Sequence, residues 1–226
     1  MVCCPVYSSD TTDTILAKLN DAIKNKQHYV RLKEERILNF KKIKSADLSE
    51  EQEYNYNLAL YKEYQKFHSD SAILYVKKNL KIAESLHKKD WFDLAQLQLA
   101  NLYSSSGKYR ESESILKSIN KKELHKSLLP NYYITYREFY EHYNANSNSK
   151  EFISQIGKYR DSLLGVLNPN FLDYKINQIQ NNIFHRKLAV AEKELLYLLK
   201  DKKDDNPQYA MITYLLGNIS EKTKQI

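Results

Sequence analysis

Apolar side chains recur at helical spacing through residues 90–119, and this segment sets the pattern for the rest of the chain. Two runs share the spacing: Leu94, Leu97, Ala100 and Tyr103, then Tyr109, Ser112, Leu116 and Ile119. The small residues Ala100 and Ser112 stand where two packed helices approach most closely. The polar stretch between the runs ends at Gly107. We therefore predict a hairpin of two short amphipathic helices.

The same periodicity predicts helices along most of the chain. We expect them over residues 10–25, 26–44, 52–68, 69–84, 131–143, 150–167, 171–184, 187–200 and 209–221. The first two form either a tight hairpin or one bent helix. Ser49, followed three residues later by Gln52, fits a capping box at a helix start. Four glycines and four prolines in 226 residues leave little material for β-turns, so the predicted fold class is all-α.

The hairpin at residues 90–119 resembles a tetratricopeptide repeat, which has a small residue near the middle of each helix, an aromatic residue one turn later and a glycine at the bend. Aligning the small-residue position of each first helix gives Leu60, Ala100, Arg137, Ile179 and Gly217. These positions lie about 40 residues apart, longer than the usual repeat of about 34. Leu60, Arg137 and Ile179 also depart from a small residue. The resemblance implies a right-handed α-solenoid of about five stacked antiparallel helical hairpins with degenerate repeats.

Several longer strings resemble one group of repeat proteins more closely. They are KEERILNFK (33–41), LYKEYQKFHSDSAILYVKKNLKIAE (60–84), LQLANLYSSSGKYRES (97–112), NYYITYREFYEHY (131–143), YRDSLL (159–164) and YAMITYLLGNI (209–219). The group consists of bacterial membrane-anchored regulators, in which an exported tetratricopeptide array precedes a transmembrane helix and a cytoplasmic part with a domain of unknown function. The resemblance covers about residues 13–220. It implies a periplasmic sensor region, although no membrane helix is present in this chain.

The two ends of the chain suggest how it is organised. Residues 1–10, which include the only two cysteines, Cys3 and Cys4, have the composition either of a disordered start or of the tail of a signal peptide. Residues 11–226 are expected to form a single α-solenoid domain. Its last helix lacks a partner, so we expect the domain to be truncated at its C-terminus. If residues 1–10 are the tail of a signal peptide, the protein is exported or periplasmic; the alternative is a cytoplasmic location.

Net charge raises the alternative of nucleic-acid binding. The chain carries a formal charge of +7, and the candidate contacts are Lys117, Lys121, Lys122 and Lys126. However, lysines outnumber arginines 29 to 6, and acidic residues are interleaved with them. That pattern favours solvated helix faces, so nucleic acid is the secondary hypothesis.

No motif in the sequence indicates catalysis, a metal or a cofactor. The histidines His28, His68, His87, His125, His142 and His185 are scattered, and none forms HExxH or another close ligand pair. No phosphate-binding loop or nucleophile elbow occurs. Sequential carboxylates such as Glu34 and Glu35 do not face each other on a helix. We therefore predict a protein that is not an enzyme and has no cofactor or metal.

The repeat resemblance also implies a binding groove, because the first helices of stacked hairpins line the concave surface. Carrying over the groove-facing positions gives Tyr54, Asn57, Tyr61, Tyr64, Asn101, Ser104, Ser105, Glu138, His142, Asp173, Gln180, Tyr214 and Asn218. We predict that this aromatic and amide-rich surface binds a protein, a peptide or a glycan-derived ligand, and self-association stays open. The competing interpretation is core packing. Core packing is favoured for Tyr132, Tyr136 and Tyr140. For Tyr54, Tyr61 and Tyr64, the sequence supports core packing and groove lining equally.

Overall fold

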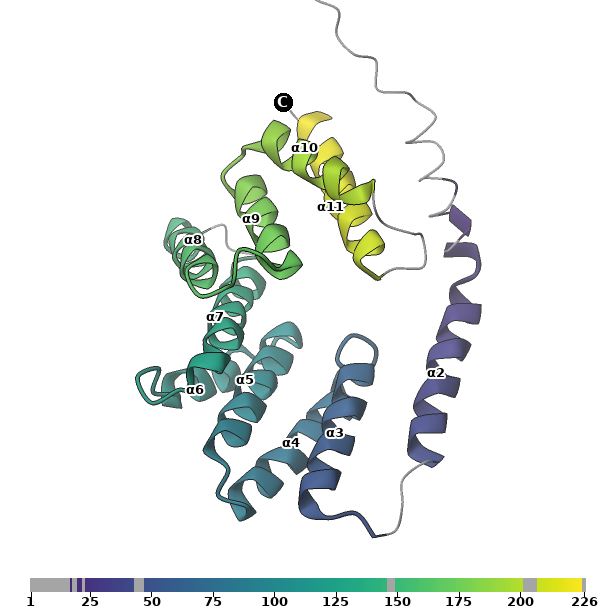
Figure 1. Cartoon of the computed structure of the whole chain (residues 1–226), viewed down its shortest axis with the longest axis vertical. Helices are drawn as coiled ribbons and strands as arrows, with labels where there is room; N and C mark the ends of the chain where they lie inside the picture. The colour runs from purple at the N-terminus through teal and green to yellow at the C-terminus, as the bar shows by residue number, and fades with distance from the viewer. Residues whose placement is uncertain are drawn as a thin grey trace, which may run out of the picture. The chain divides into compact units, whose positions relative to one another are not determined.

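The computed structural model describes residues 17, 20–21, 23–42, 47–145, 149–200 and 207–224, and these form helices and no strand (Figure 1). Two compact units are distinguished, Met1–Ser45 and Ala46–Ile226. The first unit contains α2 (Lys26–Lys42). Residues 1–10, expected to be a disordered or signal-derived tail, lie outside the described residues. A single domain over 11–226 stays a prediction.

The second unit is a series of helices that pack in consecutive pairs. They are α3 (Glu50–Tyr64), α4 (Ser69–Ser85), α5 (Lys89–Ser105), α6 (Tyr109–Ser118), the 3-10 helix η1 (Lys126–Leu128), α7 (Leu129–Asn144), α8 (Lys150–Leu164), α9 (Leu172–Phe184), α10 (Leu188–Leu199) and α11 (Pro207–Lys224). The hairpins are α3–α4, α5–α6, α7–α8 and α9–α10, and each hairpin also contacts the element that follows it. The predicted all-α class with stacked helical hairpins is confirmed.

The hairpin at residues 90–119 shows why the small residues matter. Ala100 on α5 and Ser112 on α6 are fully buried, and the Ser112 hydroxyl donates to the Ala100 carbonyl oxygen at 2.8 Å. A larger side chain at either position would push the two helices apart. At the start of α3, the Ser49 hydroxyl accepts from the Gln52 N–H and the Gln52 side chain accepts from the Ser49 N–H, which confirms the capping box.

The buried apolar side chains of α5–α8 form one cluster, and those of α9–α11 form another. The first cluster is rich in tyrosine. Tyr136 stacks on Tyr159 with ring centroids 4.8 Å apart, and Tyr140 stacks on the same ring at 5.8 Å. Tyr132 is buried beside Tyr136. Core packing of Tyr132, Tyr136 and Tyr140 is therefore confirmed.

Among the described residues, three helix ends use a residue in the left-handed backbone region. Gly107 follows α5 with φ of +76°, as the repeat pattern requires, and its open surroundings mean that only the backbone selects glycine there. His87 and Arg186 occupy the equivalent place after α4 and α9 with φ of 52° and 60°. A side chain in this region costs roughly 1 kcal/mol.

Exchanging residues at these bends should therefore change stability in opposite directions. We expect Gly107→Ala to lower the free energy of unfolding by about 1 kcal/mol and His87→Gly to raise it by a similar amount, measured by chemical denaturation. Gly165→Ala is the matched control, because Gly165 has an ordinary helical φ of −67° and an added Cβ meets nothing closer than 3.5 Å. Equal effects of the two alanine variants would contradict the backbone explanation.

Candidate functional site

A cavity of about 480 Å³ lies along the first helices of three consecutive hairpins. It is lined by α3 and the residues just after it, by α5 and by α7. The lining residues are Tyr61, Gln65, Lys66, Leu97, Gln98, Asn101, Ser105, Asn131, Ile134, Thr135, Glu138 and His142. This set is mainly amide and hydroxyl groups, with Leu97 and Ile134 as its aliphatic members. We call it the inner cavity.

Helical spacing brings the inner-cavity side chains to one face. On α5, Gln98, Asn101 and Ser105 are three and four residues apart, so they lie above one another on the same stripe. On α7, the stripe runs from Asn131 through Thr135 and Glu138 to His142. The packing of α5 against α7 places these two polar stripes next to each other.

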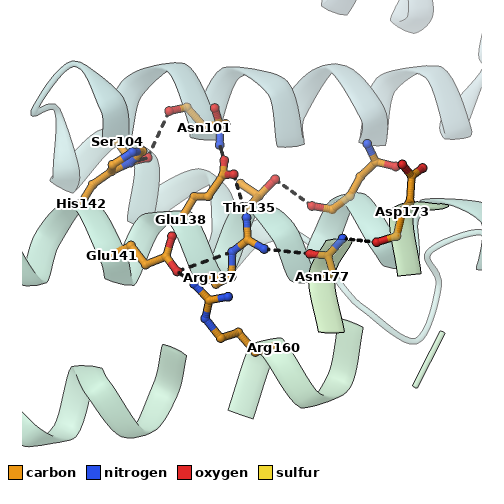
Figure 2. A network of polar contacts seen from close by, with 11 residues as sticks. Asn101, Ser104, Thr135, Arg137, Glu138, Glu141, His142, Arg160, Asp173 and Asn177 are labelled. Atoms are coloured by element: carbon orange, nitrogen blue, oxygen red, sulfur yellow. Dashed lines mark hydrogen bonds and ion pairs between the residues drawn. The ribbon is translucent and has the colours of Figure 1, made fainter. Parts of the chain in front are cut away.

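Glu138 is the charged centre of the inner cavity and is held from two sides (Figure 2). Its Oε2 accepts from the amide of Asn101 on α5, and its Oε1 accepts from Arg137 Nη2 at 2.9 Å. Both carboxylate oxygens therefore have a partner, and the guanidinium compensates the negative charge. The cavity wall at this point is polar without carrying a free charge.

His142 stands at the C-terminal end of α7, beside the inner cavity, and contacts α5 there. The Ser104 hydroxyl lies within hydrogen-bond distance of both the Asn101 carbonyl, at 3.0 Å, and His142 Nδ1, at 2.9 Å. This contact fixes the position of the imidazole ring against α5. The His142 carbonyl accepts from the Tyr109 hydroxyl at 3.2 Å, which ties the end of α7 to α6.

Tyr61 offers a hydroxyl that stays protonated. Burial and, to a smaller degree, the negative charge of Glu138 raise the pKa of Tyr61 from 10.0 to about 12. The phenol therefore remains a neutral donor and acceptor throughout the physiological range. Tyr61 on α3 and Glu138 on α7 both line the inner cavity and interact electrostatically, so the two helices face each other across it.

A network of ion pairs extends from Glu138 away from the inner cavity (Figure 2). Arg137 Nη1 donates to Asn177 on α9 at 3.2 Å, and Arg137 Nε lies 3.7 Å from Glu141 Oε1. Glu141 also accepts from Arg160 on α8. Burial is the main cause that lowers the pKa of Arg160, and the charge of Glu141 opposes it. We call Arg137, Glu138, Glu141 and Arg160 the charged quartet.

The structure brings five of the predicted groove residues to the inner cavity, namely Tyr61, Asn101, Ser105, Glu138 and His142. Ser104 is buried beneath them and supports His142. On α9 and α11, the other predicted residues lie outside the cavity lining. Asp173 and Tyr214 are exposed, and Gln180 and Asn218 are half-buried.

Three predicted residues on α3 pack inside the helix layer instead. The Tyr54 ring stacks on Trp91 at 4.1 Å and its hydroxyl donates to the Trp91 carbonyl at 3.1 Å. Tyr64 is buried against Tyr75 with ring centroids 5.8 Å apart. Asn57 is 1% exposed. The structure does not bring these side chains to the inner cavity.

Sequence analysis missed Gln98, Asn131 and Thr135. Gln98 lies about one helical turn before Asn101, Thr135 lies about one turn before Glu138, and Asn131 lies one turn before Thr135. Extending the polar stripe toward the start of each helix would have found them. Gln65 and Lys66 follow α3, where no repeat position gave a signal.

The lysines of the nucleic-acid alternative are partly engaged with neighbouring side chains. Lys117 pairs with Glu113 at 2.7 Å, and the Lys121 ammonium lies 5.0 Å from the centroid of the Tyr133 ring. Within the part of the chain that the structure describes, no three histidine, cysteine or acidic side chains gather as a metal site would require. No described helix combines the length and apolar character needed to cross a membrane.

Comparison with known protein families identifies one family that matches most of the chain. A family model described as the SusR N-terminal TPR domain matches residues 23–226. The chain belongs to this family. A search of curated proteins finds no match. The family match confirms the resemblance to tetratricopeptide-repeat (TPR) proteins. TPR domains in general are interaction modules, and stacked helical repeats offer extended binding surfaces on their inner helices.

Proposed function

We propose that this TPR domain is a non-catalytic binding module that takes a peptide segment of a partner into the inner cavity. The supporting observation is the cavity itself, which is lined by amides and hydroxyls from α3, α5 and α7. Amide side chains both donate and accept hydrogen bonds, as a peptide backbone does. The helices that carry them are already packed, so binding would order few groups and lose little free energy to that ordering.

Gln98 supports a ligand that donates hydrogen bonds. Its Oε1 is buried and has no hydrogen-bond partner among the described residues. An unpaired buried acceptor costs roughly 1–3 kcal/mol. A rotation of the Gln98 amide toward the cavity would bring this oxygen to a ligand N–H, and that hydrogen bond would remove the cost, whereas a purely apolar ligand would not.

Peptide selection tests the proposal directly. A displayed library of random peptides would be selected on the whole chain and counter-selected on the Gln98→Leu/Asn101→Leu variant. We expect enriched peptides whose affinity falls about tenfold or more in Gln98→Ala, because the lost hydrogen bond and the smaller contact act together.

The matched control is Gln178→Ala, which removes the same group from an exposed position on α9. Binding should be unchanged in that variant. If no peptide is enriched, or if both glutamine variants bind equally well, the inner cavity is not the peptide site.

We further propose that the domain is the sensor part of an exported regulator. Support comes from the family match and from the strings that resemble the periplasmic arrays of bacterial regulators. A reporter that is active only outside the cytoplasm, fused to the chain in its natural gene context, checks the location. Activity of a reporter that works only inside would favour the cytoplasmic alternative.

A further inference from the structure

Arg137 takes the position where the repeat has a small residue. At the equivalent place on α5, Ala100 lets α6 approach closely through Ser112. Arg137 is nevertheless buried, with 8% of its surface exposed. Its guanidinium fills the junction where α7 and α8 meet α9 (Figure 2). A polar centre therefore stands where the preceding hairpin has apolar and small-residue packing.

The junction is held by charges that are incompletely hydrogen-bonded. The charged quartet is balanced, with two arginines and two glutamates. Arg137 Nε and Arg160 Nε are buried without a hydrogen bond within the described residues. Buried ion pairs stabilise a fold only when every donor is satisfied, and an apolar replacement of similar volume is often as stable. Stability alone therefore gives little reason for a quartet at this position.

The contact between α8 and α9 in this junction also mixes polar and aromatic groups: the Arg160 guanidinium lies 5.2 Å from the centroid of the Phe184 ring, and the Asn181 amide donates to Asp161 at 3.2 Å. A second cavity, of about 850 Å³, lies between α8 and the bend from α9 to α10, and its lining includes Gly157, Lys158, Phe184 and Arg186. The apolar cluster of α5–α8 ends on one side of the junction, and that of α9–α11 begins on the other. Two apolar clusters thus lie on either side of the polar contacts that Arg137 and Arg160 make, and a surface hollow borders the junction.

We propose that this junction is an articulation between α3–α8 and α9–α11, and that Arg137 couples its position to occupancy of the inner cavity. Glu138 holds Arg137 through Oε1 and faces the cavity. A ligand donor that engages Glu138 competes with Arg137 Nη2, and Arg137 then shifts its hold on Asn177 of α9. By linkage, the orientation of α9–α11 alters ligand affinity by the same factor. This second half rests on the proposed peptide-binding function.

Distance measurements across the junction test the articulation without any ligand. Spin labels at Lys81 on α4 and Glu192 on α10, both exposed, would span it in a chain with Cys3→Ser and Cys4→Ser. Lys81 with Glu151 on α8 is the control pair within one block. We expect a broad distance distribution for the first pair and a narrow one for the second. Equal widths would overturn the articulation.

A variant with an apolar junction adds a second test. Arg137→Met/Glu138→Gln/Glu141→Leu/Arg160→Met removes the charges together and keeps most of the volume. We expect it to fold, judged by its helical circular dichroism, and to narrow the distribution between Lys81 and Glu192. An unchanged broad distribution would mean that the quartet does not govern the motion. If this variant does not fold, the comparison of the two label pairs in the wild-type background still tests whether the junction is an articulation.

The coupling is tested with a peptide selected on the inner cavity. Adding it should shift the cross-junction distribution in the wild type and leave it unchanged in Asn177→Leu, which removes the α9 contact outside the cavity. A peptide that binds without any shift would overturn the coupling and leave the proposed function standing. If selection yields no peptide, the proposed function and the coupling fall together, and the articulation is judged by the label pairs alone.

Discussion

Raising the pH from 10 to 12 should remove about 4 kcal/mol from the free energy of unfolding. Burial raises the pKa of Tyr54 to about 12, and burial with the charge of Glu138 raises the pKa of Tyr61 to about 12. A pKa of about 12 in place of the ordinary 10.0 corresponds to roughly 2.7 kcal/mol for each hydroxyl when the loss is complete. Because the folded-state pKa values are raised, this contribution is complete below pH 10 and is lost as the pH rises through 12.

Other tyrosines act in the same direction. Desolvation is the main cause that raises the pKa of Tyr136 and of Tyr159, and neighbouring rings of the same cluster contribute to both. Alkaline unfolding should therefore be cooperative, with the tyrosinate absorbance and the loss of helical circular dichroism following one another closely. Ionisation of all tyrosines well before the helices melt would contradict this prediction.

Single hydroxyl deletions provide the control for the alkaline transition. Tyr54→Phe loses the hydrogen bond to the Trp91 carbonyl, at a cost of about 1 kcal/mol below pH 10, but removes one of the two ionisations. Its stability should then fall less steeply with pH than that of the wild type. Tyr197→Phe removes a hydroxyl from a ring that is 67% exposed, and we expect it to keep the wild-type pH dependence.

Replacing Arg137 alone should destabilise the domain by about 3 kcal/mol. Arg137→Met leaves Glu138 without its cation, and it removes the donor to Asn177, whereas Glu141 keeps Arg160. Breaking one side of a buried pair typically costs about 3–5 kcal/mol, and the partial exposure of Glu138 places this case at the lower end. Chemical denaturation gives the total, and hydrogen exchange should show the loss most strongly in α9.

An exposed ion pair gives the comparison for Arg137. Lys117→Met breaks the pair with Glu113. The Lys117 side chain is 71% exposed and the Glu113 side chain 49%, so we expect the free energy of unfolding to change by less than about 0.5 kcal/mol. If Arg137→Met is no more destabilising than Lys117→Met, the ion pairs of the charged quartet contribute little to the free energy of unfolding. The quadruple apolar variant should recover most of the loss, because it leaves no glutamate unpaired.

Local patterns predicted the helices well because most of their signals come from the chain itself. The capping box at Ser49, the glycine after α5 and the Ala100–Ser112 contact each need only a few neighbouring residues. The ends of helices were less well predicted. The structure ends α8 at Leu164, whereas apolar residues continue to Leu167, because periodicity does not mark where a chain turns.

The candidate site was only partly predictable, for a physical reason. Whether a tyrosine on α3 lines a cavity depends on which partner ring lies beside it. Tyr54 has Trp91 and Tyr64 has Tyr75, and both are buried, whereas Tyr61 reaches the inner cavity. Those neighbours come from other helices. The role of Arg137 was not predictable for the same reason, since its partner Asn177 lies on α9, and Arg160, which shares Glu141 with it, lies on α8.

The stack of Trp91 on Tyr54 has a practical meaning for how such a repeat array comes apart. Trp91 is the only tryptophan in the chain, and its contacts tie α3 to α5, far along the sequence from α9–α11. Tryptophan fluorescence therefore reports the unfolding of α3–α5 alone, whereas far-ultraviolet circular dichroism reports the helix content of the whole chain. Where neighbouring repeats stabilise one another only pairwise, melting can start at either end, and a mismatch between the two signals tells which end opens first.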